Sequence, residues 1–319
     1  MDPRWIDYCA GDLKANCLDA GEMNPVWSLP ANVPHFTRAI AVVVDIDLRH
    51  ITRQRKSAPS GLERRLGKEI ILRRLLTSTL VLIAISVGII GVMRLRGNPD
   101  ALRAIVERRC LPADLAGTAE PLPCILVDRR NDYVALKDQK GSRHYLLLPI
   151  SHITGIESPV LLAQSAPNFF EFAWKSRGLL STGRTKQIAD DEVLLAVNSE
   201  TGRTQNQLHI HISSIKPAIR DRLREIQTAI SEQWAPVTGD LAGHSYWARR
   251  VSLSEFEATG PFRLLASGLP NAGNAMGRFS LAVIKSPPDF VLLATERNLL
   301  ALNLASAEEL QDEGCGDSN

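Results

Sequence analysis

Polar and apolar residues alternate strictly along residues 207–213. The polar set is Gln207, His209, His211 and Ser213, and the apolar set between them is Leu208, Ile210 and Ile212. Alternation with a period of two predicts a strand that buries its aliphatic face on a core. The opposite face then presents two imidazoles, an amide and a hydroxyl.

Similar patterns predict strands and helices along the rest of the chain. Strands are predicted at residues 124–128, 132–137, 144–149, 192–198 and 246–253, and a hairpin at 278–284 and 290–294. Helices are predicted at residues 101–110, 167–181, 217–233, 254–267 and 305–311. The aromatic residues of the second helix are interpreted as core. This layout predicts an α+β fold with an antiparallel sheet and helices on one side.

One long segment, residues 75–93, contains no charged residue and is mostly apolar. Its length matches one helical crossing of a bilayer, and arginines at 73, 74, 94 and 96 bracket it. A cleaved signal peptide has a shorter apolar core and a small-residue cleavage site. We therefore predict a single transmembrane anchor, preceded by a disordered cytoplasmic extension at residues 1–70 and followed by a folded domain at 100–319.

Charged residues beside the anchor predict its orientation. Basic residues crowd positions 53–74, and fewer follow the anchor, so the positive-inside rule places the N-terminus in the cytoplasm. For a bacterial host this predicts the inner membrane, with the domain in the periplasm. Cys110 and Cys124 bracket a short Pro- and Ala-containing loop, and in an oxidising compartment we expect a disulfide between them. The reverse orientation would leave two unpaired thiols.

Composition excludes few function classes. The 319 residues carry a net charge of +2, which favours no partner by itself, and no nucleic-acid partner is expected. The five cysteines include no C-x-x-C pair, which argues against a zinc ribbon or a thioredoxin-like site.

A polar loop, residues 198–206, precedes the two histidines. It contains Gly202 and Arg203, so its backbone N–H groups and one guanidinium could face an anion. Three interpretations of His209 and His211 follow: a polar sheet face without chemistry, a metal site that needs a third ligand such as His144 or His152, or a nucleophile that attacks phosphorus. The residues alone rank nucleophilic catalysis first and metal second.

Ten short segments carry a resemblance to a known family. They are Cys110–Pro112, Tyr133–Asp138, Tyr145–Pro149, Glu157–Pro159, Pro167–Phe170, Asn198–Asn206, His209–Ser213, Ala248–Val251, Met276–Arg278 and Leu292–Leu300. In this order they resemble the CDP-diacylglycerol pyrophosphatases, a membrane-anchored branch of the histidine-triad superfamily. The resemblance implies a histidine-triad-like catalytic domain that hydrolyses CDP-diacylglycerol to CMP and phosphatidate without a metal or other cofactor.

The superfamily motif has three alternating histidines, and the middle one is the nucleophile. Here the first position is Gln207 or, in another register, His209. The family's glycine stands five residues before the first position, and Gly202 therefore favours Gln207. The resemblance then implies His209 as nucleophile and His211 as the third member. A glutamine at 207 can hydrogen-bond but cannot transfer a proton.

The expected substrate contacts complete this hypothesis. The candidate binding residues are His152, Asn198, Arg203, Thr204, Gln205 and Gln207. The expected partners are the lipid substrate and the bilayer that holds it. Two alternatives stay open: a nucleotidyl hydrolase or transferase acting on soluble nucleotides, and a catalytically silent, membrane-tethered protein that binds a nucleotide or lipid.

Overall fold

A computed structural model describes residues 77–79, 98–117, 123–139, 141, 143–183, 185 and 187–312. The chain divides into two compact units, Met1–Leu95 and Arg96–Asn319. In the first unit only a helical segment at 77–79 is described. The predicted extension at 1–70 and nearly all of the predicted anchor at 75–93 lie outside the described residues. Among the described helices, none has the length and apolar character needed to span a bilayer.

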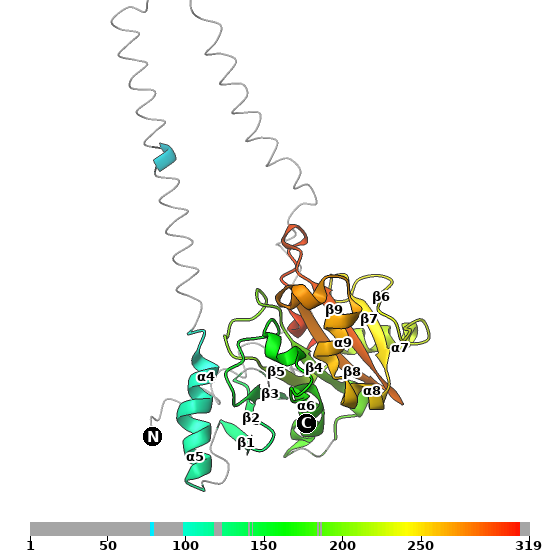
Figure 1. Cartoon of the computed structure of the whole chain (residues 1–319). Helices are drawn as coiled ribbons and strands as arrows, with labels where there is room; N and C mark the ends of the chain where they lie inside the picture. The colour runs from blue at the N-terminus through cyan, green and yellow to red at the C-terminus, as the bar shows by residue number, and fades with distance from the viewer. Residues whose placement is uncertain are drawn as a thin grey trace, which may run out of the picture. The chain divides into compact units, whose positions relative to one another are not determined.

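The second unit is built on one antiparallel sheet of nine strands (Figure 1). The strands are β1 (Cys124–Asp128), β2 (Tyr133–Lys137), β3 (His144–Pro149), β4 (Val193–Val197), β5 (Ile210–Ser214), β6 (Ala235–Pro236), β7 (Trp247–Val251), β8 (Phe279–Ser286) and β9 (Asp289–Glu296). Their order across the sheet is β1-β2-β3-β5-β4-β8-β9-β7-β6. The predicted strands therefore exist, and the α+β class is confirmed. The order places β5 centrally, between β3 and β4.

The helices of this unit are short. They are α4 (Ala101–Ile105), a π-helical turn at Val106–Cys110, α5 (Leu111–Leu115), α6 (Phe169–Lys175), α7 (Pro217–Ile226), α8 (Leu253–Ala258) and α9 (Pro261–Gly268). Single 3₁₀ turns include Leu299–Ala301 and Ala307–Leu310. Phe169 and Phe170 of α6 are fully buried, as the core interpretation of the aromatic residues predicted.

Two predicted helices differ from the structure. The single helix predicted at 254–267 is divided into α8 and α9, because Gly260 adopts φ +79° and Pro261 begins a new helix. The helix predicted at 217–233 ends at Ile226. Beyond it, the guanidinium of Arg250 binds the backbone carbonyls of Gln227 and Ile230, which turns the chain toward β6.

The prediction that helices cover only one side of the sheet is wrong. One face packs against α6, α8 and α9. On the opposite face, α7 covers residues of β4, β8 and β9, and the α4–α5 segment covers β2 and β3. Strand β4 (VLLAV) shows the reason. It has apolar side chains on both of its faces, and all of them are buried. Such strands need cover on both faces, as in buried sheets generally.

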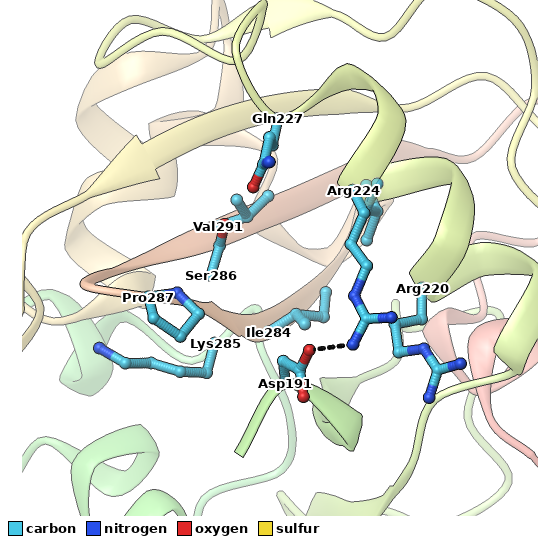
Figure 2. A pocket seen from close by; sticks show the side chains of 10 residues that line it. Asp191, Arg220, Arg224, Gln227, Ile284, Lys285, Ser286, Pro287 and Val291 are labelled. Atoms are coloured by element: carbon cyan, nitrogen blue, oxygen red, sulfur yellow. Dashed lines mark hydrogen bonds and ion pairs between the residues drawn. The ribbon is translucent and has the colours of Figure 1, made fainter. Parts of the chain in front are cut away.

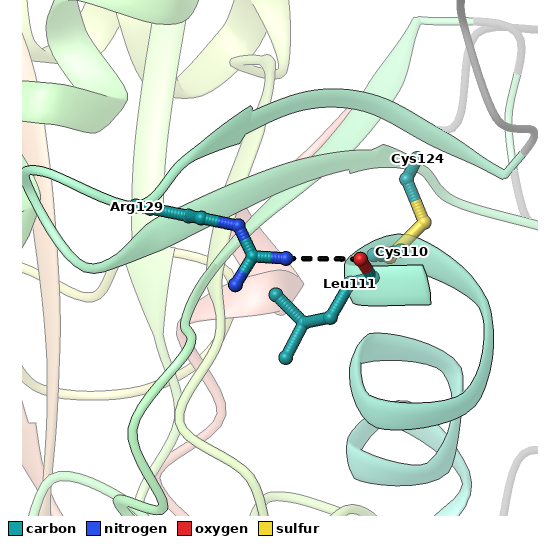
Figure 3. The surroundings of a disulfide bond; sticks show 4 residues. All are labelled: Cys110, Leu111, Cys124 and Arg129. Atoms are coloured by element: carbon teal, nitrogen blue, oxygen red, sulfur yellow. Dashed lines mark hydrogen bonds between the residues drawn. A yellow bond between two sulfur atoms is a disulfide. The ribbon is translucent and has the colours of Figure 1, made fainter. Parts of the chain in front are cut away.

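A disulfide links Cys110 to Cys124, as the sequence predicted, with a Cα–Cα distance of 5.6 Å (Figure 3). It joins the end of the π-helical turn to the start of β1. Both cysteines are fully buried beside Val134 and Leu136. Arg129 strengthens the same junction by donating to the backbone carbonyl of Leu111 at 2.9 Å.

Candidate active site

Strand β5 and the residues before it place both histidines on the central part of the sheet. The predicted strand began at Gln207, but β5 begins at Ile210. Before β5, the Gln207 side chain donates through Nε2 to the carbonyls of Pro149 and Ser151. The backbone N–H of Leu208 donates to Ile153 O, a residue beyond the end of β3. The aliphatic side chains of the segment nevertheless face the core as predicted, because Ile210 and Ile212 are fully buried.

The polar side chains of the alternating segment 207–213 are also buried, which alternation alone did not predict. His209 is 8% exposed and His211 is 4% exposed. On the sheet, His211 lies opposite Leu146 of β3 and Ala196 of β4, so it belongs to the face that α7 and the α4–α5 segment cover at its two ends. The two imidazole rings pack edge to face with centroids 4.9 Å apart.

Two further residues hold His211. His144 Nε2 lies 3.0 Å from His211 Nδ1 in a hydrogen bond. On the other side, His211 Nε2 lies 3.0 Å from Glu308 Oε1. This distance is that of an ion pair, but the two groups are not aligned as in a hydrogen bond. The outer nitrogen of His144, Nδ1, faces Asp138 Oδ2 at 3.4 Å. The result is a row of four groups: carboxylate, imidazole, imidazole, carboxylate.

One hydrogen bond connects the two rings of this row. It joins His144 Nε2 and His211 Nδ1, so one of these two nitrogens carries a hydrogen and the other accepts it. Burial, and then the charge of His211, lower the pKa of His144 to about 4. The imidazole of His144 is therefore neutral at neutral pH.

Glu308 is kept ionised by the same arrangement. Burial on its own raises the pKa of this carboxyl, but the nearby charge of His211 outweighs burial and lowers the pKa to about 2. Asn198 Nδ2 also donates to Glu308 Oε1. A carboxylate that is ionised at neutral pH and lies next to an imidazole favours one orientation of that ring.

His209 is in a different state. Its Nδ1 lies 2.7 Å from the backbone carbonyl of Gln207, and a carbonyl only accepts, so Nδ1 carries the hydrogen. Burial, and then the charge of His211, lower the pKa of His209 to about 4. The imidazole is thus neutral at neutral pH, with its lone pair on Nε2. No hydrogen bond from the described residues occupies Nε2.

The polar loop before the histidines is packed against the C-terminal segment. Ser199 Oγ donates to the carbonyl of Leu304 at 2.6 Å, and Ser199 N donates to Ala305 O at 3.0 Å. A Cβ atom on Gly202 would lie 2.6 Å from Ala305 O, so only glycine permits this approach. The loop therefore positions the segment that carries Glu308.

Several predicted binding residues have other partners in the structure. Arg203 donates through both terminal nitrogens to Glu157, at 2.7 and 2.8 Å. Gln205 accepts from the backbone N–H of Leu102 at 3.1 Å, at the start of α4. The polar ends of Asn198 and Gln207 also have protein partners. Contact of these four residues with a substrate stays a prediction.

Thr204 and His152 are the predicted binding residues that the fold leaves exposed. His152 lies between Ser151 and Ile153, whose carbonyls accept from Gln207 and Leu208. It is therefore close to the start of the histidine segment. Thr204 belongs to the polar loop itself. Both stay candidates for contact with a substrate.

Sequence reasoning missed most of the row around His211. It considered His144 only as a possible metal ligand and assigned nothing to Asp138 or Glu308. Asp138 lies within one of the family-like segments, and this was an available signal. Glu308 lies 97 positions beyond His211 in sequence, and no local pattern connects them.

Two cavities among the described residues differ from this site. One of about 100 Å³ lies between α7 and the β8–β9 hairpin (Figure 2). Its Arg224 pairs with Asp191, and its Arg220 pairs with Glu192. The other, of about 260 Å³, borders the polar loop and is lined by Glu157 and Glu200. Paired arginines and acidic walls suit phosphate poorly, so neither cavity replaces the histidine site.

The site also contains two groups that could hold a metal ion. They are Asp138, His144 and His211, and His209, His211 and Glu308, each with ligand atoms within 4.8 Å of one another. The second group adds Glu308 to His209 and His211, and so supplies a third ligand for a site that contains both histidines. Two imidazoles and one carboxylate are a ligand set that zinc accepts. Metal content therefore separates the metal and nucleophile interpretations.

Comparison with known proteins adds two findings. The structure is similar to a crystal structure of a DUF4931 family protein from Bacillus cereus, at 10% sequence identity and a TM-score of 0.38, over 54% of this chain and 85% of that chain. A likeness of this size supports no functional conclusion. The family model described as CDP-diacylglycerol pyrophosphatase matches residues 97–318, which is most of the chain and contains the whole histidine site. The chain therefore belongs to the CDP-diacylglycerol pyrophosphatase family, hydrolases of phospholipid metabolism.

Proposed function

We propose that the chain hydrolyses CDP-diacylglycerol to CMP and phosphatidate with His209 as the nucleophile. One observation carries the choice of nucleophile: His209 has its hydrogen fixed on Nδ1 by the carbonyl of Gln207, which leaves the lone pair on Nε2. In His211, by contrast, both ring nitrogens have neighbours, His144 and Glu308. A nucleophile needs a neutral nitrogen with an available lone pair, and only His209 meets that condition.

The first step transfers the cytidylyl group to the protein. His209 Nε2 attacks the phosphorus nearer to cytidine, an N–P bond forms, and the bond from that phosphorus to the phosphatidate oxygen breaks. The electron pair leaves with phosphatidate. His211 lies next to His209, and we assign it to stabilise the negative charge that develops on the phosphoryl oxygens. Phosphatidate leaves as an anion, so this step needs no proton.

The second step returns the protein to its starting state. Water attacks the same phosphorus, the N–P bond breaks, and CMP is released. The proton that the water loses is released to solvent, and His209 returns to its neutral form. Glu308 and His144 keep His211 in place during both transfers, so we assign them as positioning residues. One water is consumed for each phosphoric anhydride cleaved.

The experiment that tests this function is direct. The full chain, purified in detergent, is incubated with CDP-diacylglycerol, and CMP and phosphatidate are measured. Both products are expected in equal amounts. CMP release from soluble CDP esters but not from the lipid would favour the soluble-nucleotide alternative. Binding of the lipid without turnover would favour the silent binding protein.

Metal removal separates the two chemistries that the site permits. Prolonged chelation followed by dialysis is expected to leave turnover almost unchanged, because a neutral imidazole attacks phosphorus without a metal. Metal content is measured in parallel on the same samples. Stoichiometric zinc that is lost together with activity, and restored with it, would contradict the proposed nucleophile.

The location of the domain is also proposed. We place it in the periplasm, with the segment at 75–93 as anchor in the inner membrane and the N-terminus in the cytoplasm. The Cys110–Cys124 disulfide supports this placement, since structural disulfides are rare in reducing compartments. A reporter enzyme that is active only outside the cytoplasm, fused after Asn319, is expected to be active in cells. A stable but inactive fusion would reverse the orientation.

A further inference from the structure

A loop of exposed leucines lies next to the candidate active site. We call residues 299–304 the leucine loop; it follows β9, in the orange-to-red part of Figure 1. Leu299, Leu300, Leu302 and Leu304 are 60%, 100%, 83% and 47% exposed. From Asn298 to Ala307 the sequence contains no charged residue. Single exposed leucines are ordinary, but four within six positions form an apolar patch.

The loop is held in a defined shape. Asn298 and Asn303 exchange two backbone hydrogen bonds of 2.9 Å, and these bonds close the turn at its base. The Asn298 side chain accepts from Ala301 N at 3.3 Å, and the buried Asn303 side chain donates to Thr295 Oγ1 and accepts from Ala305 N. The polar groups of the turn are therefore satisfied inside, and the leucines are displayed outside.

The base of the leucine loop is continuous with the site. The carbonyl of Leu304 accepts from Ser199 Oγ and Thr201 Oγ1 of the polar loop. Four residues after Leu304, Glu308 faces His211 at 3.0 Å. The exposed leucines and the reacting groups thus belong to one hydrogen-bonded assembly, and whatever the loop touches is brought close to the histidines.

We propose that the leucine loop inserts into the surface of a phospholipid bilayer and brings the site to the lipid substrate. This proposal rests on the proposed function. The family's substrate carries two acyl chains, which stay in the bilayer while its diphosphate meets the enzyme. A narrow, uncharged, convex loop fits the acyl boundary of a membrane. A protein partner would need a broader surface, about 800 Å² on each side for a stable complex.

The test compares the same reaction on a substrate in a bilayer and on a substrate dissolved in water. The full chain is reconstituted into vesicles of phosphatidylethanolamine and phosphatidylglycerol. A triple variant, Leu299→Ser, Leu300→Ser and Leu302→Ser, is compared with wild type on long-chain CDP-diacylglycerol in the vesicles and on dihexanoyl CDP-diacylglycerol dissolved as monomers. We expect the triple variant to lose about tenfold or more on the vesicle substrate and to keep its rate on the soluble one. Leu253→Ser, at another exposed leucine, is the matched control and should change neither rate.

Each other result contradicts the proposal. If the triple variant and wild type have the same rate on each substrate, the leucines serve a different contact, such as a protein partner or a second copy of the chain. Equal losses on both would show that they support the active site itself.

A second readout does not depend on turnover. Leu300→Trp in the reconstituted full chain is expected to add fluorescence that brominated phospholipids quench, whereas Leu253→Trp adds none that they quench. Absence of quenching at position 300 would refute membrane contact even if the enzyme were active. Quenching in a protein that turns over neither substrate would leave membrane contact in place and refute the proposed function.

Discussion

His209→Ala is expected to reduce turnover of CDP-diacylglycerol by about 10⁴-fold or more, because it removes the nucleophile while the rest of the site stays in place. The side chain makes one hydrogen bond, to the carbonyl of Gln207, so the fold should tolerate the change. Single-turnover rates and thermal unfolding, measured on the same preparations, separate lost chemistry from lost structure.

The neighbouring histidine provides the matched comparison. His211→Ala should slow both transfer steps by about 10²- to 10³-fold, the range for loss of one group that stabilises charge on a reacting oxygen, but some covalent intermediate should still form. If instead the intermediate persists in His209→Ala and disappears in His211→Ala, the nucleophile is His211. The triad would then be read from His209 through Ser213, the register that Gly202 disfavours.

Glu308→Gln is expected to lower kcat by about 10²-fold with a smaller effect on KM, because His211 loses the carboxylate that orients it. A change in kcat without a matching change in KM separates a positioning role from a role in substrate binding. Both constants are measured on the lipid substrate.

Glu309→Gln is the natural control for that variant. Glu309 is the next residue in the chain, but its carboxylate contacts His244 at 2.7 Å and accepts from Tyr246 at 2.6 Å. This variant should lower the melting temperature and leave kcat unchanged. If the two variants behave alike, Glu308 stabilises the fold without acting on His211.

Local patterns predicted the strands well because strand formation depends on nearby residues. The alternation at 207–213 correctly placed Ile210 and Ile212 in the core. The pattern could not show what covers the histidine face, because that cover comes from His144 and from a segment near the C-terminus. The same limit explains the error about helices on one side, which depends on packing between distant elements.

The partners of the polar loop could not be predicted from the sequence. Guanidinium and amide groups bind carboxylates and backbone atoms as readily as phosphates. In this fold Arg203 is paired with Glu157, and Gln205 binds the start of α4. Only the tertiary structure reveals such partners. His209 as the nucleophile stays a prediction from the motif, and the hydrogen bond of its Nδ1 to Gln207 O is compatible with it.

Mapping the covalent intermediate identifies the nucleophile. The full chain is mixed with CDP-diacylglycerol labelled in the phosphate nearer to cytidine, quenched in alkali, in which phosphoramidates survive, and digested for mass spectrometry. The account predicts one cytidylylated peptide with the modification on His209, formed and lost at rates compatible with turnover. Modification of His211, or complete turnover with no protein-bound cytidylyl group at any time, would contradict it.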